Sequence, residues 1–515
     1  MRIIDYFDKG VTLAPDRAFL VDEAGMRTYR QAQAMSHRIA NAFKRTGIRP
    51  GTKAAVYSHN ASGAFECVLG LLRAGCVWVP VNVRNTVNDT VYTLENLDAE
   101  VLFYSAAFRK AAAELRARCP RIVHAICIEE ADGDAPSLDR WIEGLPEMSE
   151  EVQQSDEEIV TLFSSGGTTG APKGVMMANS CWEMMIAGSQ RLYRLNHPVH
   201  LVAAPLTHAA GGSALVMAPM GTTNVLLPGF DPVGVMEAIQ RHRVTHLFLP
   251  PTAIYGLLAH PDVRKYDYSS LRFFTYASAP MPPEKITEAM KVFGPVMTNS
   301  FGQTETGLNT TYFAPEEHVE ALEKGLEHRL RSVGRASLFN RIAIMDDDGN
   351  LLPPNTPGEI VARGTQIMKG YYKNPEETEK ARAFGWHHTG DIGYLDEDGY
   401  LYLIDRKRDM IISGGFNVFP AEVEKTVVTH PAVKDCAVVG VPDEKWGEAV
   451  TAVLELKAEQ SVSAEEIIAY CRARLSAVKT PKNVEFWPEL PRSPVGKVLR
   501  RKVREHFWQG RSRAI

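Results

Sequence analysis

Paired cysteines are missing from this sequence. Its 515 residues include seven cysteines, an odd number, and no two of them follow the C-x-x-C spacing. The odd count argues against a framework of disulfide bonds, and the lack of close pairs argues against a structural zinc site. A reducing compartment suits such a chain, so we predict a cytoplasmic protein.

Long apolar runs are missing as well. The most apolar stretch, residues 67–83, is interrupted by Arg73 and Pro80 and is short for a membrane span. The opening segment MRIIDYFDKG places Asp5 and Asp8 where a secretion signal would need an apolar core. We therefore expect neither secretion nor integral membrane association.

The chain also lacks an excess of positive charge. Its formal net charge of -5 gives no overall attraction to nucleic acid or to an anionic membrane surface, so nucleic-acid binding is not expected. Hydrophobic residues make up 45% and charged residues 23%, which is typical of a soluble globular protein. The length predicts two or more domains.

From about residue 50 to residue 300, short apolar runs alternate with amphipathic segments. In one such segment, DPVGVMEAIQRHR, Asp231 is placed to cap a helix. Strands that alternate with helices predict parallel sheets covered on both faces, with ligands at the loops after the carboxyl ends of the strands. The predicted strands lie at residues 53–57, 99–104, 122–128, 224–227, 244–249 and 271–276.

A different pattern begins near residue 340. Segments 341–364 and 391–406 carry Asp-Gly turns between apolar runs, which predicts antiparallel hairpins. A compact α+β region follows, with a helix that begins after the capping box of Ser463 and Glu466. The polar stretch DRKRD at 405–409 predicts a hinge between an N-terminal domain, residues 1–404, and a C-terminal domain, residues 410–515.

The segment SSGGTTGAPKG, residues 164–174, follows an apolar run directly. It is not a Walker A motif, because Pro172 precedes Lys173 and Gly174 follows it. Its glycines let backbone N–H groups approach an anion closely, and its hydroxyls add donors, which is the chemistry of a polyphosphate clamp. Taken alone, a flexible turn explains the segment equally well. The candidate phosphate-binding residues are Ser164, Ser165, Gly166, Gly167, Thr168, Thr169, Gly170 and Lys173.

This segment resembles the signature of the adenylate-forming superfamily, which includes acyl-CoA synthetases, luciferases and peptide-synthetase adenylation domains. Further motifs that are similar to those of the family follow in the family's order: PLTHAAGG, SFGQTET, HTGDIG, DRKRDMIISGGFNVFPAEVE and PRSPVGK. The resemblance covers nearly the whole chain. It implies a large N-terminal adenylation domain of mixed sheets flanked by helices, with a β-subdomain, and a smaller mobile α+β C-terminal domain.

The motif SFGQTET supplies candidate contacts to ATP. Glu305 lies at the end of a predicted strand, where its carboxylate, with Thr304 beside it, can hold Mg²⁺ against the phosphates; a solvated loop glutamate is the alternative. Phe301 offers a ring for stacking on adenine or for simple packing. The resemblance implies that Ala277, Ser278, Ala279 and Asn299 contact adenine, and Gly302 is a further candidate for cofactor binding.

Two residues on either side of the second hairpin are candidates for the ribose. The resemblance implies that Asp391 binds the two ribose hydroxyls and that Arg406 contacts the same sugar. Taken alone, Asp391 is equally a turn residue, and Arg406 is equally a surface arginine at the hinge.

Lys497, in PRSPVGK, is the candidate for catalysis of the first step. A carboxylate that attacks the α-phosphate builds negative charge on both partners, and a lysine between them stabilises that transition state. Without the motif, a solvated lysine before a helix would be the better interpretation. The resemblance implies that the C-terminal domain rotates about Arg408 between two steps, which brings Gly415 against the pantetheine of CoA.

The resemblance places His208, in PLTHAAGG, at the wall of the acyl pocket, whereas a buried core histidine is the alternative. The small residues 209–212 would leave room for a bulky acid, and no extra arginine marks a second carboxylate site. Other candidates for the pocket, which fit a plain core equally well, are Trp182, Met184, Met185, Tyr255 and Tyr276.

The predicted function is an AMP-forming acid–CoA ligase that uses ATP, Mg²⁺ and coenzyme A on an aromatic or other bulky acid. A medium- or long-chain fatty acid, or a carrier protein as the acceptor, is the alternative. Luciferases carry a lysine where this chain has Ile412, so that lysine's role does not transfer. A catalytically inactive homologue is not favoured, because Glu305, Asp391, Arg406 and Lys497 are all present. A homodimer is a possible assembly that the sequence does not decide.

Overall fold

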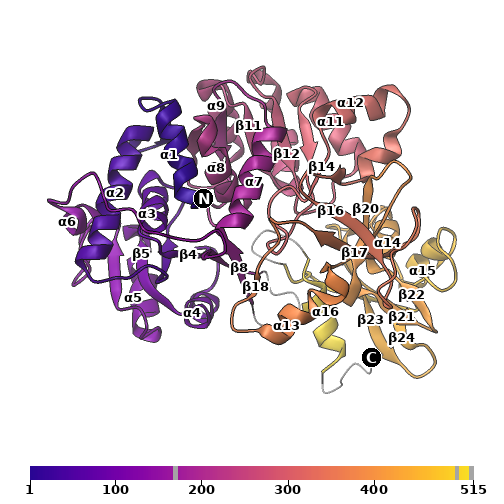
Figure 1. Ribbon diagram of the computed structural model, residues 1–515. Helices are drawn as coiled ribbons and strands as arrows, with labels where there is room; N and C mark the ends of the chain where they lie inside the picture. The colour runs from indigo at the N-terminus through magenta and orange to yellow at the C-terminus, as the bar shows by residue number, and fades with distance from the viewer. Residues whose placement is uncertain (166–171, 493–497, 510–515) are drawn as a thin grey trace. The chain divides into compact units, whose positions relative to one another are not determined.

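The structure, a computed structural model, describes residues 1–165, 172–492 and 498–509. Its chain forms two compact units that combine helices with sheets, which confirms the predicted α/β class (Figure 1). Unit 1 comprises Met1–Ile342, Ala362–His387 and Gly399–Leu401, and unit 2 comprises Ala343–Val361, His388–Asp398 and Tyr402–Ile515. Among the described residues, no helix is long and apolar enough to cross a membrane.

The first seven-stranded sheet of unit 1 is parallel except at one edge, where β2 runs antiparallel to β1. Parallel neighbours end at the same edge of a sheet. Tyr276 of β12 is paired with Asn299 of β13, so the loops that follow these two strands begin side by side. The strand order is β13 (Met297–Asn299), β12 (Phe273–Tyr276), β11 (His246–Leu249), β9 (Val199–Val202), β10 (Thr223–Leu226), β1 (Ala18–Asp22) and β2 (Gly25–Thr28).

The second seven-stranded sheet contains the strands that flank the glycine-rich loop. β7 and β8 are antiparallel neighbours, with Ser164 opposite Gly174, and β18 pairs antiparallel with β8 at the edge. The loop is therefore the connection of a hairpin. The strand order is β18 (Gly370–Tyr371), β8 (Gly174–Ala178), β7 (Ile159–Ser164), β4 (Val77–Pro80), β3 (Lys53–Tyr57), β5 (Ala99–Tyr104) and β6 (His124–Cys127).

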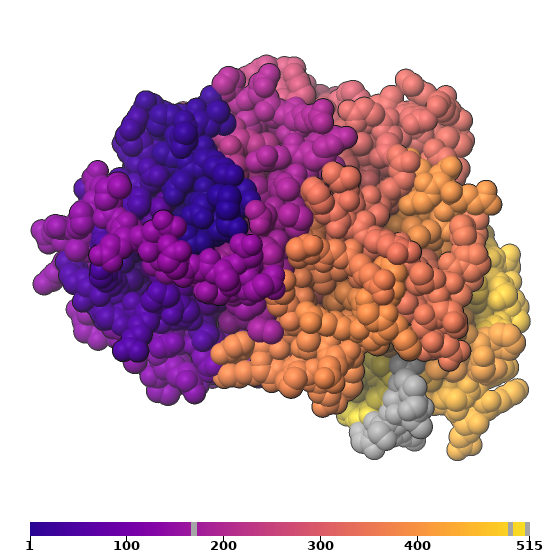
Figure 2. All heavy atoms as spheres, viewed as in Figure 1, coloured from indigo at the N-terminus to yellow at the C-terminus, as the bar shows by residue number. Residues whose placement is uncertain are grey.

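Helices of unit 1 share one hydrophobic cluster with strands of both sheets, and α3 is buried on nearly every side, as expected for a central helix. The N-terminal helix α1 lies beside α7, as the hydrogen bond from Ile3 N to Asn179 Oδ1 at 3.0 Å shows. In Figure 2 the indigo atoms of the N-terminal segment adjoin magenta atoms. The helices are α1 (Ile3–Leu13), α2 (Tyr29–Arg45), α3 (Ser62–Arg73), α4 (Val87–Asn96), α5 (Arg109–Arg118), α6 (Leu138–Ile142), α7 (Asn179–Leu192), α8 (Ala209–Met217), α9 (Pro232–His242), α10 (Pro251–Leu258), α11 (Pro283–Phe293), α12 (Pro315–Glu323) and α13 (Pro375–Lys380). A two-stranded sheet joins β14 (Thr311–Tyr312) to β15 (Arg335–Ala336).

Unit 2 holds most of a four-stranded sheet, in the order β16 (Arg341–Met345), β17 (Gly358–Arg363), β19 (His387–Leu395) and β20 (Leu401–Arg406). The predicted Asp-Gly turns are present: Gly349 and Gly399 have φ angles of 85° and 80°, a region that favours glycine. The other sheet contains β22 (Phe416–Val418), β21 (Ile411–Ser413), β24 (Gly447–Leu456), β23 (Val433–Asp443) and β25 (Asn483–Phe486). The helices of unit 2 are α14 (Pro420–Val427), α15 (Ala464–Arg472) and α16 (Arg500–Phe507).

Two predicted helix starts are confirmed. The Asp231 side chain accepts from Gly234 N at 2.7 Å and caps α9, and Ser463 and Glu466 form the predicted capping box of α15. The predicted hinge at 405–409 falls inside unit 2, which also takes in segments 343–361 and 388–398. This division does not test a rotation, so the hinge and the domains 1–404 and 410–515 stay predictions.

Candidate active site

The described ends of the glycine-rich loop are joined by backbone and side-chain hydrogen bonds. Ser165 N donates to Lys173 O at 2.8 Å, and Lys173 N donates to the Ser165 hydroxyl at 3.0 Å. Ser164 is the last residue of β7. These bonds close the base of the loop beside the strand pair β7–β8. Five of the predicted phosphate contacts lie outside the described residues: Gly166, Gly167, Thr168, Thr169 and Gly170.

Lys173 faces one anion and one aromatic ring. Its Nζ lies 2.5 Å from Glu377 Oε2 and 4.7 Å from the centre of the Tyr371 ring. The hydrogen bond from Lys173 is the main cause that lowers the pKa of Glu377. The ammonium group therefore has a carboxylate partner within unit 1, and an incoming phosphate would compete with that carboxylate.

Glu305 lies in the loop after β13 and is held by the segment before α13. Its backbone carbonyl accepts from Met368 N at 2.8 Å, and its Oε1 accepts from the Tyr371 hydroxyl at 3.1 Å. Thr304 is half-buried beside it. A carboxylate and a hydroxyl fit Mg²⁺, which usually binds one or two protein carboxylates and completes its shell with phosphates and water. Among the residues that the structure describes, no cluster of three His, Cys, Asp or Glu side chains could hold a metal.

The predicted adenine residues gather at the carboxyl ends of β12 and β13. Ala277, Ser278 and Ala279 follow β12 directly, and Ser278 has a φ of 71°, a strained conformation for a residue with a side chain. Asn299 ends β13 and exchanges backbone hydrogen bonds with Phe313. Strand ends of a parallel sheet are the usual ligand edge. In the loop that follows, Phe301 is only 8% exposed, whereas Gly302 is exposed.

Asp391 and Arg406 form an ion pair within unit 2. Arg406 Nε lies 2.8 Å from Asp391 Oδ1, with the Asp391 side chain 10% exposed and that of Arg406 45% exposed. Asp391 belongs to β19, and Arg406 is the last residue of β20. The two residues predicted to contact the ribose are thus neighbours on one hairpin.

The remaining predicted residues of unit 2 have different surroundings. Arg408 pairs with Asp409 at 3.4 Å, and desolvation is the main cause that lowers its pKa. Gly415 is exposed, with a φ of 80° and open space where a Cβ would be. Lys497 lies outside the described residues.

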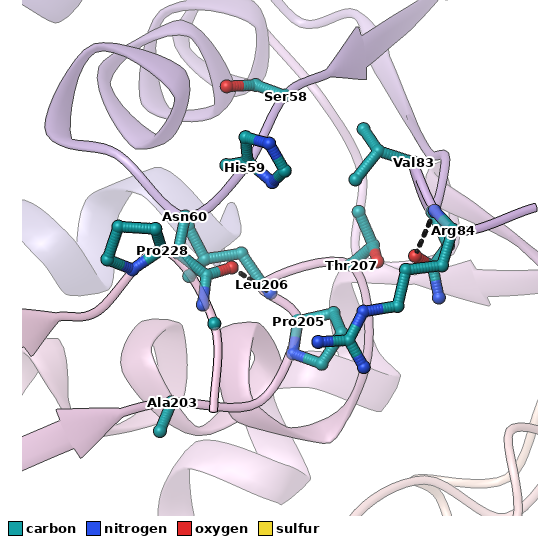
Figure 3. Close-up of a pocket in the computed structure, with 12 residues that line it drawn as sticks. Ser58, His59, Asn60, Val83, Arg84, Ala203, Pro205, Leu206, Thr207 and Pro228 are labelled. Atoms are coloured by element: carbon teal, nitrogen blue, oxygen red, sulfur yellow. Dashed lines mark hydrogen bonds between the residues drawn. The ribbon is translucent and has the colours of Figure 1, made fainter. Parts of the chain in front are cut away.

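His208 directly precedes α8 and follows Thr207, which lines a cavity of about 290 Å³ (Figure 3). The cavity is lined by His59, Arg84 and Thr207, among others, and Figure 3 shows the Arg84 side chain pointing toward Pro205. His208 is exposed, yet the surrounding protein lowers its pKa by desolvation and the Arg84 guanidinium lowers it further. His208 is therefore not the buried core histidine of the alternative interpretation.

Asn60 holds the loop that carries His208. Its Nδ2 donates to Ala204 O and Leu227 O, both at 3.0 Å, and its Oδ1 accepts from Leu206 N at 2.8 Å. Gly211 lets the loop turn tightly into α8, because a Cβ there would lie 1.7 Å from Leu206 O. The motif PLTHAAGG thus builds a rigid start for α8.

Three of the candidate pocket residues, Trp182, Met185 and Tyr276, belong to the buried core. Trp182 is buried and its indole N–H donates to Thr161 Oγ1 at 3.1 Å, and Tyr276 is buried with its hydroxyl 2.9 Å from His318 Nε2. Met185 Sδ accepts from Leu308 N, which places it beside the loop after Glu305. Met184 and Tyr255 are half-buried.

Two sequence profiles match this chain. The profile described as AMP-binding enzyme matches residues 7–372, more than half of the chain. The chain belongs to the AMP-binding enzyme family. The profile described as AMP-binding enzyme C-terminal domain matches residues 422–497.

Known members of the AMP-binding enzyme family resemble the chain over most of its length. It is 34% identical to a feruloyl-CoA synthase of Amycolatopsis sp. over 492 residues, which covers 93% of this chain and 94% of the relative. It is 39% identical over 367 residues to the medium/long-chain-fatty-acid–CoA ligase FadD8 of Mycobacterium tuberculosis, which covers 70% of this chain and 63% of the relative. The solved amide bond synthetase McbA of Marinactinospora thermotolerans has a TM-score of 0.87 and 29% identity, and covers 98% of this chain and 100% of that one.

These comparisons confirm the predicted superfamily, the fold class and the class of enzyme. This AMP-binding enzyme is an ATP-dependent, AMP-forming acid–CoA ligase. Sequence reasoning missed three residues that the structure brings to the site: Tyr371, Glu377 and Arg84. Each contacts or flanks a motif that is distant in sequence, and no local pattern marks it.

Proposed function

We propose that this AMP-binding enzyme activates an aromatic or other bulky carboxylic acid. The observation that carries the proposal is that the start of α8 and the loop after Glu305 meet in apolar side chains, Leu308 and Met185, which pack closely against Gly212 and Gly307. A Cβ on Gly212 would lie 3.2 Å from Leu308 Cδ1, and a Cβ on Gly307 would lie 2.8 Å from Met185 Sδ. Met185 is unbranched and adaptable, so it can move aside for a ring. The name of one relative, feruloyl-CoA synthase, also supports an aromatic acid as the substrate.

A medium- or long-chain fatty acid is the second candidate. The relative with the highest identity given above is named a medium/long-chain-fatty-acid–CoA ligase, although the match covers 70% of this chain. A panel of acids of both kinds decides between the two.

In the first step, the acid's carboxylate attacks the α-phosphate of ATP, an acyl-adenylate forms, and pyrophosphate leaves. We assign the β- and γ-phosphates to Lys173 and the loop that it ends. Asp391 and Arg406 are assigned to the ribose, and residues 277–279 and Asn299 to adenine. We assign the charge that develops at the α-phosphate to Lys497.

Mg²⁺, when bound, neutralises phosphate charge and orients the leaving pyrophosphate. Glu305 and Thr304 are the residues of this chain that we assign to it.

In the second step, the CoA thiol attacks the acyl carbonyl and AMP leaves. We assign the cavity lined by His59 and Arg84 to CoA rather than to the acid, because a guanidinium binds phosphate oxygens through two parallel hydrogen bonds. Gly415 is assigned to the pantetheine, and Arg408 to a hinge at 405–409. A carrier protein as the acceptor is the alternative, and we further propose a cytoplasmic enzyme.

The experiment that tests this proposal incubates the protein with ATP, Mg²⁺, CoA and single acids, and measures AMP release and the mass of the acyl-CoA. Cinnamic and benzoic acids are compared with straight-chain acids from acetate to palmitate. We expect the highest kcat/KM for an aromatic acid. Preference for a straight-chain acid would replace the proposal with its second candidate.

A further inference from the structure

Tyr371 lies between the two residues that are assigned to the ATP phosphates and the metal ion. Its hydroxyl donates to Glu305 Oε1 at 3.1 Å. The centre of its ring is 4.7 Å from Lys173 Nζ, within the range of a cation–π interaction. One side chain of unit 1 therefore contacts both the glycine-rich loop and the SFGQTET loop.

The backbone of Tyr371 is itself held in place. Tyr371 pairs with Val175 across β18 and β8, and its backbone N–H donates to Thr378 Oγ1 at 2.8 Å. Three residues earlier, Met368 N donates to Glu305 O. The short segment 368–371 thus fixes Glu305 through both its backbone and its carboxylate.

This arrangement matters because a glutamate side chain has three rotatable bonds. Fixing such a side chain in one rotamer costs free energy whenever a ligand has to do it. A hydroxyl that donates to one carboxylate oxygen fixes the side chain beforehand and leaves most of the carboxylate's lone pairs available, since a carboxylate accepts about four hydrogen bonds or metal contacts. Partners of this kind orient ligating groups in known metal sites.

We propose that Tyr371 is a positioning residue that orients Glu305 for Mg²⁺ and its bound nucleotide. The inference rests on the proposed role of Glu305. The proposed role belongs to the Tyr371 hydroxyl alone, because the ring of a phenylalanine at this position would still face Lys173.

The test uses the full-length protein with the substitution Tyr371→Phe. Binding of Mn²⁺, as a stand-in for Mg²⁺, is measured by electron paramagnetic resonance with a non-hydrolysable ATP analogue present. We expect the Mn²⁺ dissociation constant to rise about ten-fold, the usual scale for loss of such a partner. The Mg²⁺ concentration for half-maximal ATP–pyrophosphate exchange should rise by a similar factor, while the KM for the acid and the conversion of supplied acyl-adenylate by CoA stay unchanged.

The neighbouring tyrosine provides a matched control. The Tyr372 hydroxyl donates to Asp98 Oδ2 at 2.8 Å, away from Glu305. Tyr372→Phe removes the same atom from the next residue and should leave Mn²⁺ binding unchanged. An equal loss of Mn²⁺ affinity in both variants would overturn the inference.

Glu305→Gln separates failure of the inference from failure of the proposed function. If Glu305→Gln weakens Mn²⁺ binding and Tyr371→Phe does not, the role of Tyr371 is wrong and that of Glu305 stands. If neither does, the assignment of Glu305 is wrong and the inference fails with it. The double variant Glu305→Gln/Tyr371→Phe keeps the test decisive if Tyr371→Phe also lowers stability. If the hydroxyl acts through Glu305, adding Tyr371→Phe to Glu305→Gln causes no further loss of Mn²⁺ affinity. Additive losses of Mn²⁺ affinity would contradict the inference.

Discussion

Arg406 Nε lies 2.8 Å from Asp391 Oδ1. The Asp391 carboxylate is buried, and a buried charge needs a charged partner, which Arg406 supplies from the facing strand of the same hairpin. The pair leaves a short acidic side chain held in one orientation. We propose that this side chain accepts hydrogen bonds from the two vicinal hydroxyls of a ribose.

Replacing Asp391 by Asn keeps the shape of the side chain and removes its charge. We expect the KM for ATP to rise by roughly ten-fold or more, because charge-assisted hydrogen bonds to the ribose are lost, while the KM for the acid changes little. Acid-dependent ATP–pyrophosphate exchange measures both constants. Asp396→Asn, in the turn of the same hairpin, is the control and should behave like the parent. A selective rise in the KM for the acid would contradict the assignment.

Replacing Lys497 by Ala tests the catalytic assignment. We expect ATP–pyrophosphate exchange to fall by about a hundred-fold or more, as for removal of a group that stabilises transition-state charge, while CoA still converts supplied acyl-adenylate. Lys502→Ala, an exposed lysine of α16, serves as the control. Equal losses in both half-reactions would show that Lys497 does not act on the first step alone.

Replacing Gly211 by Ala tests the start of α8. The added Cβ would lie 1.7 Å from Leu206 O, so the His208 loop must shift. We expect a loss of stability of about 2 kcal/mol, typical of overpacking, and a raised KM for the acid. Gly188→Ala, in α7, is the control, because its Cβ would meet only Phe339 at 3.8 Å. Chemical denaturation of both variants measures the difference, and unchanged stability of Gly211→Ala would contradict the packing argument.

Replacing Arg84 by Ala tests the assignment of the cavity. We expect the KM for CoA to rise about ten-fold or more and the KM for the acid to stay constant, because one guanidinium–phosphate contact is lost. Steady-state rates at varied CoA measure this. A rise in the KM for the acid instead would assign the cavity to the acid, and a substrate with a second carboxylate would then be the one to test.

His318 predicts a pH dependence of stability. A carbonyl can only accept, so Nδ1 donates to Ala314 O at 2.8 Å and the Tyr276 hydroxyl donates to Nε2. Burial lowers the pKa of His318 to about 4. Between its ordinary pKa near 6.5 and about 4, the unfolded chain binds the proton and the folded protein does not, so stability falls as the pH falls through this window.

The substitution His318→Gln removes that proton site. We expect the slope of the free energy of unfolding against pH, between pH 6 and pH 5, to decrease by up to about 1.4 kcal/mol per pH unit. Urea unfolding at several pH values measures the slope. Identical slopes for the parent and the variant would show that His318 is not linked to this loss of stability.

Local patterns predicted elements better than they predicted element ends. Residues 53–57 and 99–104 form strands with the predicted bounds, because each apolar run coincides with its pairing partners. The strand predicted at 244–249 begins only at His246. Arg243 is left-handed, with a φ of 54°, and Val244 N donates to Ile239 O, so Val244 takes part in the cap that ends α9 and not yet in the strand.

The order of the motifs made much of the candidate site predictable. The residues that contact those motifs only in the folded protein could not be predicted. The sequence placed Glu305, Asp391 and Arg406 in motifs, and the structure brings Asp391 and Arg406 together. It did not indicate Tyr371, because a tyrosine in an edge strand has no signal until Glu305 is folded against it. The sequence did not indicate Arg84 for the same reason, because Arg84 and Thr207 line one cavity only in the folded protein.

The central claim is that this chain makes an acyl-adenylate. Acid-dependent exchange of labelled pyrophosphate into ATP, without CoA, measures that step directly. We expect exchange that requires both a carboxylic acid and Mg²⁺ and that is strongest with an aromatic or other bulky acid. Absence of exchange with every acid of a broad panel, from a folded protein that binds ATP, would contradict it.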